Sequence, residues 1–202
     1  MRSFAFWGIT GALLLFSFAT NGLNTHRAAL LTDRGLTPVS AAAVLSVAGL
    51  ATLGSKLFTG YLLDVFPAHR AAAILLFCTA IGLVFVLTGG SLVMTYASAV
   101  LVGVGMGAES DAVPYLLARY FGLDRFSELY GYTWTVYAIA GGLGPLLAGA
   151  VFDHTGSYRS ALLLFPGLVL AASGLFASLP HYGAARITAR SCEISVPCKP
   201  QA

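Results

Sequence analysis

Long apolar stretches alternate with short polar or breaker-rich segments along this chain, and this pattern predicts its elements. Each apolar stretch holds roughly 20 residues or more, the length that an α-helix needs to cross about 30 Å of hydrocarbon. Strand-like alternation over segments of about ten residues does not occur, which disfavours an outer-membrane barrel. The pattern predicts an all-α membrane protein with one six-helix transmembrane domain, residues 1–180. The predicted spans are about 4–31, 38–63, 71–88, 92–121, 128–152 and 160–179.

Local signals support several ends of these spans. Thr37 stands directly before Pro38, and a threonine cap followed by proline in the first turn is typical of a helix start. Residues 89–91 read Gly-Gly-Ser, which predicts a tight turn. Residues 181–202 are polar and contain Pro197 and Pro200, so we expect a disordered cytoplasmic tail there.

Composition agrees with a lipid environment. The 202 residues are 57% hydrophobic and 9% charged, whereas a soluble domain has about 25% charged residues. The net charge of +3 is small and spread along the chain, which does not favour nucleic-acid binding. We therefore expect the lipid bilayer to be a partner of this chain and nucleic acid not to be one.

The distribution of lysine and arginine predicts an orientation. With six spans both termini share one side, and the positive-inside bias places that side in the cytoplasm of a cell (inner or plasma) membrane. Arg27, Arg34 and Arg159 fall on the opposite side. The cytoplasmic side collects Arg2, Arg70, Arg119, Arg125, Arg186, Arg190 and Lys199, with Lys56 near its boundary.

Two carboxylates, Glu109 and Asp111, lie inside the fourth apolar span. A charged residue at the centre of a membrane helix costs about 2.5–3.5 kcal/mol to insert, so such groups usually serve a pathway, a proton relay or a structural pairing. Residues two apart point about 200° away from each other, so different partners are expected. Which one faces a cavity is open. Glu109 is slightly favoured for coupling because it follows the Gly103–Gly107 run, whose bared backbone could admit water.

Polar and aromatic residues form helical stripes in two other spans. The first-span stripe is Ser17, Asn21, Asn24 and Thr25, and the fifth-span stripe is Tyr130, Trp134, Tyr137 and Gly141. Both have the spacing of one helix face, and they could line opposite walls of a substrate cavity. Interhelical hydrogen bonds and interfacial anchoring are the alternatives. Spans three and six contain no charged residue or histidine, and this recurrence after three helices indicates a three-plus-three repeat. Such charge-free spans suit contact with lipid, whereas the other four suit a wet path.

Sequence motifs do not support an enzyme. The chain has no G-x-S-x-G nucleophile elbow, no H-E-x-x-H zinc motif and no phosphate-binding loop. We therefore predict a non-enzymatic protein and no cofactor.

The loop after the second span resembles the cytoplasmic signature of the major facilitator superfamily. Gly60, Asp64 and Arg70 match that pattern, whereas Val65 stands where the family usually has arginine. In this resemblance Asp64 is a conformational latch at a helix end. Three more stretches resemble the same family and occur in the order that the family has them. They are residues 31–38, residues 107–122 with Tyr115, and residues 144–158.

The resemblance implies the C-terminal six-helix half of a twelve-helix fold, in the branch of monocarboxylate and oxalate/formate carriers. Residues 134–151 contain no lysine to meet an oxalate. The implied function is secondary active transport of a small organic solute, such as a carboxylate, by alternating access with Glu109 or Asp111 in coupling or binding. A matching N-terminal half or a second copy is the implied partner. The alternative is a non-transporting remnant or an assembly subunit.

Overall fold

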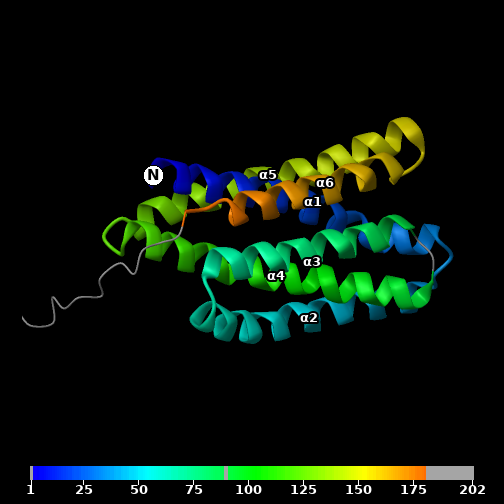
Figure 1. The fold of residues 1–202 in the computed structure, drawn as a ribbon. Coiled ribbons are helices and arrows are strands. Elements are labelled where there is room, and N and C mark those ends of the chain that lie inside the picture. The colour runs from blue at the N-terminus through cyan, green and yellow to red at the C-terminus, as the bar shows by residue number, and fades with distance from the viewer. Residues whose placement is uncertain (1, 89–90, 181–202) are drawn as a thin grey trace, which may run out of the picture.

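The computed structural model describes residues 2–88 and 91–180, which form a bundle of long helices (Figure 1). In chain order the helices are α1 (Arg2–Asp33), α2 (Pro38–Val65), α3 (Ala68–Thr88), α4 (Leu92–Phe121), α5 (Phe126–Thr155) and α6 (Arg159–Ala177). All six are long and apolar enough to cross a membrane, so the predicted all-α architecture with six spans is confirmed. The predicted tail, residues 181–202, lies outside the described residues.

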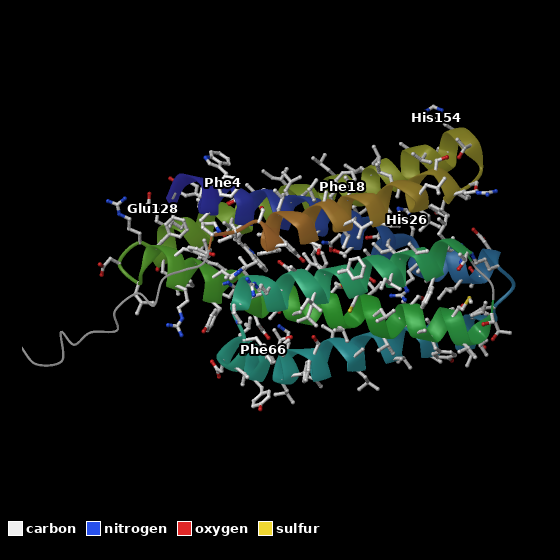
Figure 2. All side chains as sticks on the ribbon, viewed as in Figure 1. Phe4, Phe18, His26, Phe66, Glu128 and His154 are labelled. Carbon is white, nitrogen blue, oxygen red and sulfur yellow. The ribbon has the colours of Figure 1, made fainter. Side chains whose placement is uncertain are left out.

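The ends of the helices follow local chemistry. The Thr37 side chain accepts a hydrogen bond from the Ser40 N–H, and Pro38 occupies the first turn, so the predicted start of α2 is confirmed. Figure 2 shows Phe4, Phe66 and Glu128 towards one end of the bundle and His154 at the other. We call these the N-terminal end and the far end.

Helix packing repeats after three helices. The most extensive contacts join α2 with α4 and α1 with α5, while α4 packs on α3 as α1 packs on α6. Exchanging α1 with α4, α2 with α5 and α3 with α6 converts each of these pairs into another observed pair. The α3–α6 contact is unchanged by this exchange. This exchange pattern is that of a three-plus-three repeat.

The exposed surface is distributed unevenly among the helices. α3 is half buried and α6 nearly so, because they pack on each other and on α4 and α1, whereas α2 and α5 are mostly exposed. Large apolar side chains such as Leu53, Leu57 and Tyr61 project outward from α2. α3 and α6 are therefore covered to the same degree as α1 and α4, and within this bundle α2 and α5 are the exposed helices, which differs from the lipid-facing role expected of spans three and six.

Candidate functional site

An ion pair at membrane depth links α2 to α4. The Lys56 ammonium lies 3.6 Å from Asp111 Oδ1, with the two side chains 45% and 32% exposed. Lys56 Nζ also donates to Ser110 Oγ at 2.5 Å, and that hydroxyl lies 3.3 Å from the same Asp111 oxygen. Lys56 precedes the last residue of α2, Val65, by nine positions, which is about 14 Å along the helix. Lys56 therefore lies more than two turns inside α2, and the charged pair faces an open side of the bundle.

Glu109 points away from this pair. Its side chain is 5% exposed, and it lines a small cavity with Leu13 of α1 and with Thr133 and Trp134 of α5. Within the described chain, Glu109 makes no hydrogen bond or ion pair, while Asp111 pairs with α2. The two carboxylates thus lie on different helix faces, as their spacing requires. No group of three potential metal ligands occurs among the described residues.

The glycine run before Glu109 serves helix packing. A Cβ atom added at Gly103 would lie 3.0 Å from the Ala51 Cβ, and one added at Gly107 would lie 2.8 Å from the Ser55 Cβ. Both glycines are buried against α2, because small residues let membrane helices approach closely. Close packing on α2 thus accounts for these glycines, and the preference for Glu109 as the coupling group, which was based on water admitted at the glycine run, stays a prediction.

The polar stripe of α1 divides between two neighbouring helices. Ser17 Oγ donates to the Tyr137 carbonyl of α5 at 2.8 Å, and Asn21 Nδ2 donates to the Ser17 carbonyl at 3.0 Å. Asn24 Nδ2 instead reaches Met106 Sδ of α4 at 3.3 Å. The two asparagines, predicted as one cavity-lining face, therefore adjoin α5 and α4 respectively.

The aromatic stripe of α5 is a continuous stack. Ring centroids are 5.4 Å apart between Phe126 and Tyr130, 6.0 Å between Tyr130 and Trp134, and 4.9 Å between Trp134 and Tyr137. Trp134 is half exposed and also lines the small cavity that holds Glu109. The stack therefore connects the N-terminal end of α5 with the buried carboxylate of α4.

An open cleft of about 420 Å³ lies between α1, α2 and α4. Lys56 follows Thr52, one of its lining residues, by one helical turn, so the cleft leads towards the ion pair. The lining residues are Asn24, Thr25, Arg27, Leu45, Ala48, Gly49, Thr52, Gly103 and Met106.

The remaining predicted residues lie nearer the N-terminal end. The Tyr115 hydroxyl accepts from Arg119 Nη2 at 3.0 Å, one turn along α4 and away from the Lys56 pair. Gly60, Asp64 and Arg70 are exposed around the α2–α3 junction. No ion pair joins Asp64 to Arg70 in the described parts of the chain, so the latch has no partner within this bundle.

A second open cleft, of about 810 Å³, lies at the far end. Burial lowers the pKa of Arg34, and burial, followed by the charges of Asp33 and Asp153, raises the pKa of Tyr158. The Tyr158 hydroxyl lies 3.3 Å from Nδ1 of His26. The lining residues are Leu30, Asp33, Arg34, Leu87, Thr88, Phe152, Gly156, Ser157, Tyr158, Arg159, Leu162 and Leu163.

Sequence reasoning missed two cations, Lys56 and Arg27. The sequence analysis assigns each only to a side of the membrane, although both lie inside a helix with at least one full turn beyond them. Arg27 is 1% exposed and lies between α1 and α4. The available signal was their position inside the predicted spans 4–31 and 38–63, several residues from either end.

Comparison with known proteins gives consistent matches. The family model for the Major Facilitator Superfamily matches residues 3–189. Monocarboxylate transporter 13 of Bos taurus is 29% identical over 181 residues, covering 85% of this chain and 42% of the relative. The Rattus norvegicus counterpart is 30% identical over 188 residues, with the same coverage of 85% and 42%. Monocarboxylate transporter 11 of Homo sapiens is 30% identical over 168 residues, covering 77% of this chain and 35% of the relative. The chain spans about two fifths of the length of these curated relatives.

Proposed function

Because the chain belongs to the major facilitator superfamily, we propose that it is the C-terminal six-helix half of a secondary active transporter for a small organic carboxylate. The observation that carries this proposal is the ion pair between Lys56 and Asp111. It supplies a cation at membrane depth that an incoming solute can reach. The relatives' names, which specify monocarboxylates, support the same solute class.

Lys56 is suited to bind the solute by exchanging partners. Its ammonium has three donors, and Ser110 and Asp111 engage it in the solute-free state. A solute carboxylate can replace Asp111 at the ammonium without leaving Lys56 unpaired. The displaced Asp111 carboxylate must then be hydrated or protonated. Solute binding is thereby coupled to a change in the contacts between α2 and α4. Alternating access requires such a difference between two states.

Glu109 is proposed as the proton-coupling group. An ionised carboxylate without a partner is costly away from water, and Glu109 is buried with no hydrogen bond in the described structure. Binding a proton removes that cost, so proton transfer to Glu109 would stabilise the packed α1–α4–α5 interface. Its neighbours Thr133 and Trp134 connect that interface to the exposed aromatic stack.

A second six-helix body is proposed to cover α2 and α5. These helices carry the fewest buried residues in the bundle, and the Lys56 pair and the cleft beside it open on the side of α2. The matched relatives are more than twice as long as the aligned region, which supports a matching N-terminal half, with a second copy as the alternative. Asp64 would then latch a helix of that body.

Uptake measurements test this function. The chain is expressed alone and with a matching N-terminal half, and entry of a radiolabelled monocarboxylate such as lactate is measured in vesicles. Lys56→Met should reduce uptake at least tenfold, whereas Lys56→Arg, which keeps the charge, should retain part of it. If neither the chain alone nor the pair of halves takes up the solute, although both insert normally, the alternative of a non-transporting remnant or assembly subunit would be favoured.

The proposed orientation places both termini in the cytoplasm of a cell membrane. Reporter fusions at Arg70 and Arg125 should read as cytoplasmic, and those at Arg34 and Gly156 as external, because lysine and arginine concentrate on the side of the termini. An external reading at Arg70 would reverse the scheme.

A further inference from the structure

Arg27 is a buried cation with unused hydrogen-bond donors. Its side chain is 1% exposed, and Nη2 donates to Ser98 Oγ of α4 at 3.4 Å. The Nε and Nη1 atoms are buried without a partner among the described residues. Arg27 precedes the end of α1, Asp33, by six residues, which is about 9 Å along the helix axis. The guanidinium therefore sits below the far end of the bundle.

The Arg27 charge has no compensating carboxylate. An arginine side chain stays charged in proteins, and a buried charge without a partner is strongly unfavourable. The one ion pair in the described parts of the chain, between Lys56 and Asp111, belongs to the other half of the bundle. Asp33 lines the open far-end cleft and not the cavity beside Arg27.

That cavity is enclosed by α1, α3 and α4 and has room for roughly one water-sized body. A second guanidinium, that of Arg34, also lines it and donates to the Val86 carbonyl at 2.6 Å. The Ser98 hydroxyl donates its own proton to the Thr95 carbonyl, so it meets Arg27 as an acceptor. The hydrogen-bond donors still available to a ligand in the cavity are therefore those of Arg27 and Arg34, and no acidic residue lines the cavity.

We propose that this cavity binds a single small inorganic anion such as chloride, held by Arg27 and Arg34. The anion would supply the missing acceptor for Nε and Nη1 and would neutralise a buried charge. The size of the cavity excludes an organic carboxylate. Because Arg34 also lines the far-end cleft, the anion can enter from that end. Arg27 also lines the open cleft that leads towards Lys56, but the anion is held by Arg27 and Arg34 alone, so this proposal does not depend on the transport proposal.

Thermal unfolding of the purified full chain in detergent tests the site. Chloride is titrated at constant ionic strength against gluconate, an anion too large for the cavity. The melting temperature should rise saturably with chloride, since a ligand that binds the folded state stabilises it. Arg27→Gln should weaken the apparent chloride affinity at least tenfold. Its melting temperature in gluconate should equal or exceed that of the unmodified chain, because the uncompensated charge is gone.

Arg125→Gln is the matched control, since Arg125 is an exposed arginine at the N-terminal end, away from the cavity and from the far-end cleft. It should keep the full chloride response. If Arg27→Gln does not accumulate, Arg34→Gln provides the same comparison. Equal responses to chloride and gluconate, or an unchanged chloride midpoint in the arginine variant, would overturn the proposal.

Discussion

The ion pair between Lys56 and Asp111 allows a quantitative test by a double-mutant cycle of Lys56→Met, Asp111→Asn and their combination. Two unit charges 3.6 Å apart attract by about 4.6 kcal/mol at an effective dielectric constant of 20. Both side chains are partly exposed, so solvent screening and side-chain entropy reduce the net coupling to about 1 kcal/mol. Each single change also leaves one charge unpaired at membrane depth, which costs free energy. We therefore expect each single variant to lose about 1–2 kcal/mol and the double variant to lose less than their sum.

The measurement is thermal unfolding of the purified chain, followed by the fluorescence of its two tryptophans. For a chain of this size about 1 kcal/mol corresponds to a shift of roughly 2–4 °C. Each single variant should melt a few degrees lower, and the double variant should melt at or above the lower of the two. The coupling should also shrink at high salt. Additive losses in the double variant would refute a direct interaction between the two charges.

Three further changes test packing, coupling and the latch. Gly105→Ala should destabilise the chain by about 1–2 kcal/mol in thermal unfolding, because the new Cβ would lie 2.8 Å from the Thr79 Cβ, whereas Gly131→Ala, with open space around it, should be neutral or slightly stabilising. Glu109→Gln should leave the melting temperature unchanged or higher while abolishing pH-driven uptake and sparing solute exchange; full pH-dependent uptake would exclude this residue from coupling. Asp64→Asn should reduce uptake several-fold in a complete carrier at normal membrane expression, and undiminished uptake would reject the latch.

The six spans could be predicted because their signal is local. A helix that crosses a bilayer must satisfy its own backbone and present an apolar surface of fixed length, so hydropathy alone locates it. The Thr37 cap and Pro38 likewise act within one turn, and the structure confirms them. Helix ends without such a cap, as at Phe126 of α5, shifted by a few residues.

The site was less predictable because it depends on which helix lies opposite. The spacing of Glu109 and Asp111 required two different faces, but nothing local to α4 places α2 beside one and α5 beside the other. The sequence assigned Lys56 and Arg27 only to a side of the membrane, whereas their surroundings depend on contacts with residues more than 40 positions away. The absence of charge in residues 71–88 and 160–179 fitted contact with lipid and contact with other helices equally well.

The pairing of the helices sets an order for biosynthesis. Apart from α3 with α4, consecutive helices touch little, and each helix finds its main partner elsewhere in the chain. During synthesis α2, α3 and α4 can assemble as soon as α4 has emerged. α1 must wait in the membrane for its main partners, and Ser17 lacks its acceptor, the Tyr137 carbonyl, until α5 arrives. A chain with only its first four spans inserted would therefore leave the face of α1 that packs on α5 and α6 uncovered.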